Sequence, residues 1–270
     1  MKIIKKIFIA LSALAVIYYL TLCVWFYYKQ ESILFNTVKL SKDHVFNFES
    51  IFEERYIPMQ DSTTLHGVLF RANESKGLIL WLPGGRGMID SIGLDAHCHT
   101  DLNYDLFVLN YRGFGKSNGK ISSEKQFNND MQMVYDYFKK EYDEKNIVIY
   151  GYSLGTGPAV VLAQNNNPRM LILRASYYSM VELISKYFSY LPVALLQKYK
   201  FPVYKNLRNI KCPVLIIHGE KDKKIPVIVA YRLKEQFKSG DNLLIIKNQG
   251  HDEFEKNVDY LEKIKLYLGK

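Results

Sequence analysis

The Gly-x-Ser-x-Gly stretch at residues 151–155 constrains the fold of this chain more than any other feature. A short β-branched run, residues 146–149, precedes it, and an apolar run, residues 158–163, follows it. A serine in this pattern between a predicted strand and a predicted helix indicates a tight turn that strains the backbone of Ser153. A side chain on either flanking glycine would clash, and the hydroxyl lies at a helix N-terminus, which favours negative charge. Taken alone, the pattern also fits a glycine-rich turn without chemical function.

Segments with the character of strands and of helices alternate along the chain. Apolar and alternating runs predict strands at residues 54–59, 64–70, 78–82, 105–110, 146–149, 170–173, 213–217 and 243–246. Ser123 and Gln126 predict a capping box at the start of an amphipathic helix, and residues 254–268 predict a final helix. The alternation predicts an α/β fold with a mostly parallel central sheet and helices on both faces.

The N-terminal region predicts a membrane helix. Three lysines within the first six residues precede residues 7–28, a run of 22 residues without a charge. At about 1.5 Å per residue this helix is roughly 33 Å long, enough to cross a bilayer. No convincing signal-peptidase site follows, and Leu22 stands before Cys23 where a lipoprotein signal needs a small residue. We therefore expect an uncleaved anchor with a cytoplasmic N-terminus, and the rest of the chain on the outer (periplasmic or extracytoplasmic) side.

Charge and cysteine usage limit the expected partners. The net charge is +9, and the four lysines up to Lys29 account for four of these charges, which leaves +5 for the rest of the chain. No arginine-rich arm or basic helix stands out, so we expect no nucleic acid partner but a mild attraction to anionic lipid. Three cysteines without a pairing pattern predict no disulfide. We expect no cofactor and a monomer, and no metal at His97-Cys98-His99, because adjacent side chains diverge.

Two later residues are candidates to activate the serine. A serine hydroxyl becomes a good nucleophile only when a base takes its proton and an acid orients that base. In a parallel sheet such partners are expected on loops at the carboxyl ends of strands. Asp222 and His251 each follow a predicted strand, and the chain order serine, aspartate, histidine fits a catalytic triad. Taken alone, Asp222 also fits a solvated charge among lysines, and His251 a residue at the start of the last helix.

Two other residues lie close to these candidates in the sequence. Glu220 is the reserve acid, and His218 is expected to support the loop that carries Asp222.

The oxyanion of an acyl-transfer reaction needs two backbone N–H donors. We expect one from Leu154, directly after the serine, and the other from Gly85 in the Pro-Gly-Gly-Arg-Gly loop at residues 83–87. The loop also fits a plain flexible segment. Arg86 either holds an acidic group of the substrate or points to solvent.

From about residue 30 to its end, the chain resembles the α/β-hydrolase superfamily. More narrowly, it is similar to single-pass, membrane-anchored serine hydrolases whose relatives include protein depalmitoylases. Five blocks carry the resemblance, at residues 30–35, 110–117, 151–157, 212–222 and 250–251. The resemblance implies that Ser153 is the nucleophile, Asp222 the acid and His251 the base, and that residues 177–205 form a small cap. Relatives usually have His-Gly-Asn at Pro83-Gly84-Gly85, and often an acidic residue and a proline around Arg174-Ala175-Ser176.

The expected organisation is an anchor at residues 1–28, a juxtamembrane connector at 29–52 and an α/β-hydrolase catalytic domain at 53–270. The expected function is a membrane-tethered serine hydrolase that cleaves an ester or thioester of a small-molecule or lipid-like acyl substrate, with Arg86 and Tyr177 as substrate contacts. A serine aminopeptidase or amidase is an alternative. A catalytically silent, membrane-anchored binding module on the same fold is another.

Overall fold

The computed structural model of the chain describes residues 1–36, 38–87 and 89–269. These residues form one eight-stranded sheet in the order β1-β2-β4-β3-β5-β6-β7-β8. The strands are β1 (Phe52–Pro58), β2 (Thr64–Phe70), β3 (Leu78–Leu82), β4 (Asp105–Leu109), β5 (Ile147–Tyr152), β6 (Met170–Arg174), β7 (Val214–Gly219) and β8 (Asn242–Ile246). β2 pairs antiparallel with β1 and with β4, and every later pairing is parallel. The predicted mostly parallel sheet is confirmed.

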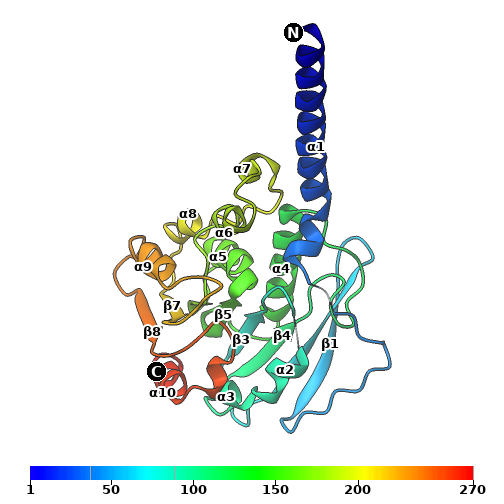
Figure 1. Ribbon diagram of the computed structural model, residues 1–270. Helices are drawn as coiled ribbons and strands as arrows, with labels where there is room; N and C mark the ends of the chain where they lie inside the picture. The colour runs from blue at the N-terminus through cyan, green and yellow to red at the C-terminus, as the bar shows by residue number, and fades with distance from the viewer. Residues whose placement is uncertain (37, 88, 270) are drawn as a thin grey trace.

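Helices cover both faces of this sheet (Figure 1). The α-helices are α1 (Lys2–Leu34), α2 (Ile89–Leu94), α3 (His97–Thr100), α4 (Glu124–Phe138), α5 (Thr156–Asn165), α6 (Met180–Tyr187), α7 (Val193–Leu196), α8 (Val203–Leu207), α9 (Ile228–Lys234) and α10 (Val258–Leu268). Three short 3₁₀ helices are η1 (Glu144–Asn146), η2 (Ser153–Gly155) and η3 (Phe254–Lys256).

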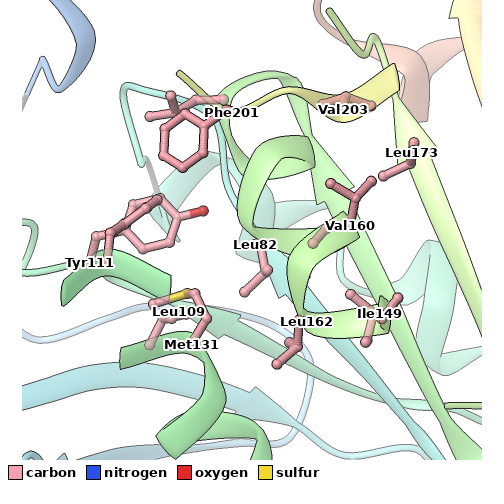
Figure 2. Packing of buried hydrophobic residues seen from close by; sticks show 14 of the residues in the cluster. Leu82, Leu109, Tyr111, Met131, Ile149, Val160, Leu162, Leu173, Phe201 and Val203 are labelled. Carbon is pink, nitrogen blue, oxygen red and sulfur yellow. The ribbon is translucent and has the colours of Figure 1, made fainter. Parts of the chain in front are cut away.

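Alternate side chains of the central strands enter two separate cores. In β3, Leu80 and Leu82 belong to the core beneath α4, α5, α8 and α9, whereas Ile79 and Trp81 belong to the core beneath α2 and α10. Figure 2 shows the first of these cores, where Leu82 meets Val160 of α5. Because successive side chains of a strand point to opposite faces, a strand covered on both faces is apolar at every position. That is why the central strands are continuous apolar runs in the sequence.

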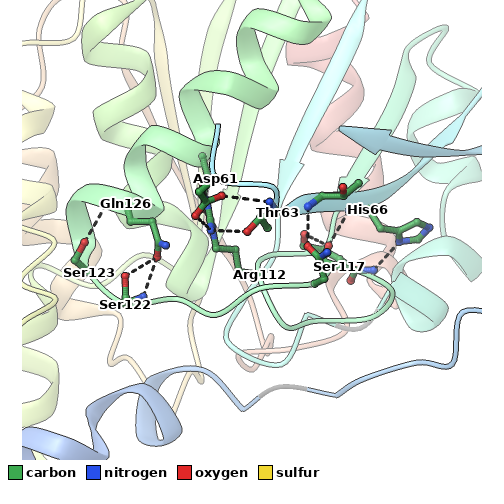
Figure 3. A network of polar contacts seen from close by, with 12 residues as sticks. Asp61, Thr63, His66, Arg112, Ser117, Ser122, Ser123 and Gln126 are labelled. Carbon is green, nitrogen blue, oxygen red and sulfur yellow. Dashed lines mark hydrogen bonds and ion pairs between the residues drawn. The ribbon is translucent and has the colours of Figure 1, made fainter. Parts of the chain in front are cut away.

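The helix α4 begins where the sequence predicts. The Ser123 hydroxyl accepts a hydrogen bond from the N–H of Gln126 at 3.1 Å, as an N-cap does. The Gln126 side chain does not return to Ser123, because its Oε1 accepts from the N–H and the hydroxyl of Ser122 instead (Figure 3). One half of the predicted capping box is therefore present, and the other half is shifted by one residue.

Most of α1 stands clear of the rest of the molecule (Figure 1). Every side chain up to Thr21 is exposed, and Leu22 and Cys23 are the first that pack against the domain. Among the described residues, α1 is the one helix long and apolar enough to cross a bilayer. A helix with this composition near an N-terminus is a candidate membrane anchor or signal.

The last turns of α1 differ from the sequence-based expectation. The expected anchor ends at residue 28 and the expected juxtamembrane connector covers residues 29–52, whereas the helix continues without a break to Leu34. Phe26 and Leu34 are buried in the first core. The buried Gln30 amide donates to the carbonyl of Leu196 at 2.9 Å and accepts from the N–H of Lys198 at 2.8 Å. These long-range contacts hold the turns helical, and local periodicity gives no sign of them.

A buried ionic network lies between β4, α4 and the β1–β2 turn, and we call it the Arg112 cluster: Arg112, Asp130, Asp61 and Thr63 (Figure 3). The guanidinium of Arg112 donates twice to Asp130, at 2.5 and 2.7 Å. Its third nitrogen donates to Asp61 at 2.6 Å and to Thr63 at 2.8 Å. The hydrogen bonds to Asp130 raise the pKa of Arg112. The cluster ties the hairpin turn to a helix on the other side of the loop after β4.

Candidate active site

The turn between β5 and α5 has the strained geometry that the sequence predicts. Ser153 has φ of +50°, in the left-handed region that non-glycine residues rarely adopt. A Cβ on Gly155 would lie 2.1 Å from the carbonyl oxygen of Leu82, and one on Gly151 would lie 2.7 Å from the Cβ of Ala159. Both positions therefore require glycine. The result is a serine at the start of the short helix η2, at the carboxyl end of a central strand.

The structure brings Ser153, His251 and Asp222 together from three separate loops. His251 Nε2 is 3.0 Å from the hydroxyl oxygen of Ser153, and its Nδ1 is 2.7 Å from Oδ2 of Asp222. Asp222 follows β7 and His251 follows β8, so both lie at the same edge of the sheet as Ser153. This is the hydrogen-bonded chain by which a serine loses its proton to a histidine that a carboxylate orients.

The carboxyl of Asp222 is held in its ionised form. Burial alone would raise its pKa, but hydrogen bonds with His251 and from the N–H of Ile225 outweigh that effect and lower it. The second oxygen, Oδ1, accepts from the N–H groups of Lys224 and Ile225, each at 2.9 Å. His218 is fully buried, and its Nε2 is 2.8 Å from the carbonyl oxygen of Ile225, so it supports this loop.

Glu220, the reserve acid, is exposed and lies elsewhere. Its carboxylate accepts a hydrogen bond from the N–H of Asn248 at 3.0 Å, in the turn after β8. Among the described residues, the partner of His251 Nδ1 is Asp222, and Glu220 forms no hydrogen bond with His251. The geometry therefore favours Asp222 over Glu220 as the partner of His251.

Two supporting residues were not identified from the sequence. The Tyr152 hydroxyl, next to the serine, donates to the carboxylate of Asp252 and to the carbonyl oxygen of His251, the latter at 3.3 Å. Arg174, at the end of β6, pairs with Glu255 in η3 and lies 4.4 Å from the ring centre of Tyr152. Both contacts fasten the loop that carries His251. Position 174 stood out in the sequence as a departure from relatives, but nothing there indicated Glu255 as its partner.

Leu154 and Gly85, whose backbone N–H groups are expected to hold an oxyanion, line the same pocket as Ser153. Leu154 lies in the first turn of η2, where N–H groups have no partner within the helix. Gly85 lines the same pocket as Ser153, and a Cβ on it would lie 2.6 Å from the carbonyl oxygen of Leu34. The loop is anchored on both sides, because the Gly85 carbonyl accepts from Asn36 at 2.9 Å and the Pro83 carbonyl accepts from the Tyr111 hydroxyl at 2.8 Å.

A pocket of about 220 Å³ opens above Ser153 and His251. Its walls are mainly apolar and come from the end of α1, from α6 and from the loop after β7. The lining residues are Ile33, Leu34, Gly85, Ser153, Leu154, Tyr177, Met180, Leu183, Ile184, Tyr187, Lys224, Ile225 and His251. Met180, Leu183, Ile184 and Tyr187 lie at helical spacing on one face of α6. Neither wall was predicted from the sequence, and the wall from α1 depends on how the end of this helix packs on the domain.

The two suggested substrate contacts lie in different places. Tyr177 lines the pocket but is almost fully buried, and its hydroxyl donates to the carbonyl of Leu154 at 3.2 Å. Burial raises its pKa, so the phenol stays neutral. Tyr177 therefore packs behind the turn that holds the serine. Arg86 is exposed and is not among the residues that line the pocket.

The His97-Cys98-His99 run packs as part of the fold. His99 is buried against Trp81 and Tyr150, with ring centres 5.4 and 5.9 Å apart. Burial lowers its pKa to about 4, so the ring is neutral near pH 7. Within the described part of the chain, no cluster of three or more His, Cys, Asp or Glu side chains is arranged to hold a metal ion.

Comparisons with known proteins agree with this fold. A family model described as serine aminopeptidase, S33, matches residues 73–201. Alpha/beta hydrolase domain-containing protein aho-3 of Caenorhabditis elegans is 29% identical over 180 residues, 65% of this chain and 51% of that protein. Alpha/beta hydrolase domain-containing protein 17C of Xenopus tropicalis is 30% identical over 177 residues, 63% and 54% of the two chains. The chain thus spans about half the length of these curated relatives.

Solved structures show the same architecture at low sequence identity. An esterase from Pyrococcus furiosus superposes with a TM-score of 0.67 at 17% identity, covering 87% of this chain and 97% of that one. An esterase from Exiguobacterium antarcticum gives a TM-score of 0.63 at 19% identity, with 80% and 99% covered. At such identities the likeness concerns the fold alone. The chain has the α/β-hydrolase fold, and the family model and the relatives confirm its resemblance to the α/β-hydrolase superfamily.

Proposed function

We propose that this chain is a membrane-tethered serine hydrolase that cleaves an ester or thioester through an acyl-enzyme on Ser153. The observation that carries the proposal is the pair of short contacts from His251, 3.0 Å to Ser153 and 2.7 Å to Asp222, at the floor of an apolar pocket. The α/β-hydrolase fold and its esterase neighbours support a hydrolase of this kind. A serine in a strained turn with a base in contact is arranged for nucleophilic attack.

Acylation follows from the positions of these groups. The Ser153 oxygen attacks the acyl carbonyl, and its proton passes to Nε2 of His251. The Asp222 carboxylate holds the Nδ1–H and stabilises the imidazolium that forms. The negative charge on the former carbonyl oxygen is stabilised by the N–H groups of Leu154 and Gly85. Collapse of the tetrahedral intermediate expels an alkoxide or thiolate, which takes the proton from His251.

Deacylation repeats the same steps with water. His251 takes a proton from a water molecule, whose oxygen attacks the acyl group on Ser153. The second tetrahedral intermediate uses the same two N–H donors. Its collapse restores the Ser153 hydroxyl with the proton from His251 and releases the carboxylic acid. No further group is required by this cycle.

The lining of the pocket favours an apolar acyl group over a peptide N-terminus. The matching family is described as a serine aminopeptidase, so an amidase is the second candidate. An aminopeptidase needs a carboxylate near the nucleophile to hold the substrate's ammonium group. Among the described residues that line the pocket, none is acidic, and Lys224 is the cationic one. A panel of acyl esters and thioesters against amino-acyl amides tests this preference.

Labelling with a fluorophosphonate probe tests the nucleophile directly. We expect the detergent-solubilised full chain to label, and Ser153→Ala to remain unlabelled. Ser239→Ala, at an exposed serine outside the pocket, is the matched control and should label like the wild type. Equal labelling of Ser153→Ala and wild type would contradict the proposal.

We also propose that α1 spans the membrane once, with its N-terminus in the cytoplasm and the catalytic domain outside. The exposed apolar helix and the N-terminal lysines support this orientation. A deletion of residues 1–21 removes the exposed part of α1 and leaves the turns that pack on the domain. We expect alkaline carbonate to extract the deleted protein from membranes but not the full chain. Resistance of the deleted protein to extraction would contradict the assignment.

A further inference from the structure

The charge-free run of α1 is longer than the part of it that stands clear of the domain. The run begins at residue 7, after the lysines, and the first contact with the domain is at Leu22, so 15 residues, 7–21, are both charge-free and exposed. At about 1.5 Å per residue they span roughly 22 Å, less than the roughly 30 Å thickness of a hydrocarbon core. The charge-free run continues to Tyr28 and completes that thickness. The domain surface beside residues 22–28 must therefore lie at the level where the hydrocarbon meets the lipid headgroups.

The part of the domain at that level is residues 187–196, which we call the cap rim: the last residue of α6, the segment between α6 and α7, and α7 itself. Phe188 packs against Phe26 and Trp25, with ring centres 5.1 and 6.5 Å apart. The amide of Gln30 donates to the carbonyl of Leu196 at 2.9 Å. Figure 1 shows α7 beside the lower part of α1. These contacts fix the height of the cap rim relative to the expected span.

The cap rim exposes large apolar side chains to solvent. Leu195 is 84% exposed, Tyr187 62% and Tyr190 57%. On α1, Trp25 and Tyr28 are also exposed. Contiguous exposed apolar side chains mark an interaction surface, and tyrosine and tryptophan are enriched at the membrane interface.

The charged side chains around the cap rim fit an anionic lipid surface. Lys186 and Lys200 flank the cap rim in the chain, and Lys29 precedes Gln30, which bonds Leu196; all three lysines are exposed. The nearby acidic groups are already paired, because Glu31 contacts Lys198 at 3.2 Å and Glu182 contacts Arg232 at 2.7 Å. Exposed lysines next to an apolar surface are attracted to anionic headgroups.

The candidate active-site pocket reaches the same surface. Ile33 and Leu34 of α1 form one wall, and Leu183 and Ile184 of α6 form another. Tyr187 both lines the pocket and belongs to the exposed cap rim. An apolar path therefore runs from the cap rim to Ser153, and it follows the helix that leads into the bilayer.

We propose that the cap rim is a second membrane contact, which rests the mouth of the pocket on the bilayer and admits acyl chains directly from the lipid phase. The partner surface is a bilayer that contains anionic lipid, and the substrate class is an ester or thioester whose acyl chain is embedded in that bilayer. The substrate part rests on the proposed hydrolase function. The docking part does not, and it has its own test.

Tryptophan quenching by lipids brominated on their acyl chains tests the docking. The full chain is reconstituted in phosphatidylcholine–phosphatidylglycerol vesicles, with Leu195→Trp as the probe. Val258→Trp is the matched control, since Val258 is 67% exposed on α10, outside the cap rim. We expect the brominated lipid to quench the emission added by Leu195→Trp and to leave that added by Val258→Trp unchanged. Equal behaviour of the two variants overturns the docking, whatever the enzyme does.

Turnover tests the route of the substrate. Leu195→Asp should lower hydrolysis of a long-chain ester embedded in the vesicles about tenfold, because it removes an apolar side chain from the lipid contact. Hydrolysis of a water-soluble short-chain ester should stay unchanged, which also shows that the variant is folded. Val258→Asp should change neither rate. Equal loss on both substrates, or loss on neither, overturns the route. An unlabelled Ser153 with quenched Leu195→Trp would refute the hydrolase and leave the docking in place.

Discussion

The Arg112 cluster and the Ser153 site are both hydrogen-bonded ionic networks, but they differ in whether their polar groups border a pocket. In the Arg112 cluster every guanidinium nitrogen has a partner oxygen, on Asp130, Asp61 or Thr63. In the Ser153 site the hydroxyl contacts His251 within the chain, and Ser153 and Leu154 also line a pocket. All nitrogens of the Arg112 guanidinium are thus bonded within the chain, whereas the second network borders a pocket that the proposed substrate would enter. We therefore expect mutations in the first to change stability, and mutations in the second to change activity.

The largest expected effect is on activity at the Ser153 site. Asp222→Asn keeps the shape of the side chain but removes the carboxylate that orients His251. We expect kcat to fall on the order of 10⁴-fold, with the thermal midpoint of unfolding close to that of the wild type. Ester hydrolysis and thermal denaturation in the same detergent measure both. If Asp222→Asn lowered the thermal midpoint as much as an Arg112 variant does, the two networks would not differ in their contribution to stability.

Arg112→Met should lower stability and leave the activity of the folded protein close to that of the wild type. It leaves the buried Asp130 without its cation, and breaking a buried ion pair in this way costs about 3–5 kcal/mol. Probe labelling of the folded fraction should stay close to that of the wild type. Denaturant titration measures the loss of stability. The double variant Arg112→Met with Asp130→Leu should recover part of it, because neither charge is then buried alone.

Arg174→Met should lower both activity and stability, with a smaller loss of activity than Asp222→Asn. Arg174 is a positioning residue that pairs with Glu255 and packs on Tyr152, beside the loop of His251. Its loss should lower kcat on the order of 10²-fold through misplacement of His251, and should lower stability as well. Arg174→Lys keeps the positive charge, but lysine does not stack on the aromatic rings. We therefore expect it to recover only part of the kcat that Arg174→Met loses. An unchanged kcat in Arg174→Met would show that Arg174 does not position His251.

The smallest effect concerns acid stability at the exposed edge of the Arg112 cluster. The hydrogen bond from Arg112 lowers the pKa of Asp61 from 3.8 to about 2. A carboxyl with a lowered folded-state pKa stabilises the fold above its unfolded pKa, and this stabilisation is lost as the pH falls through the folded value. We therefore expect wild type to lose a small amount of stability between about pH 4 and pH 2 that Asp61→Asn does not lose. Denaturation at several pH values measures the difference.

Local patterns were enough to predict much of the fold and the candidate triad. The strands are continuous apolar runs because helices cover both faces, and Gly151 and Gly155 mark a turn that admits no side chain. Strand order along the chain then places Asp222 and His251 on the edge that carries Ser153. The chain order and the resemblance to α/β-hydrolases then pointed to these three residues as a triad.

Contacts between distant segments could not be predicted in the same way. The turns of α1 from Gln30 to Leu34 are helical and line the pocket because they pack on α7 and on the loop of Gly85. Arg174 faces Glu255 across a gap of 81 residues. A single sequence carries no signal for such pairings, because each partner is compatible with many neighbours.

The unbroken course of α1 limits how far the domain can travel. A flexible linker of glycine and serine would let a tethered domain sweep a volume around its anchor. Here the helix continues without interruption into turns that are packed on the domain. An α1 inserted in a membrane would therefore hold the domain at a fixed distance from the bilayer. Under the proposed function, the protein and a membrane-embedded substrate would meet by lateral diffusion in two dimensions, and the surface density of that substrate would set the encounter rate. A substrate dissolved in the surrounding water would have to reach the membrane surface to be cleaved.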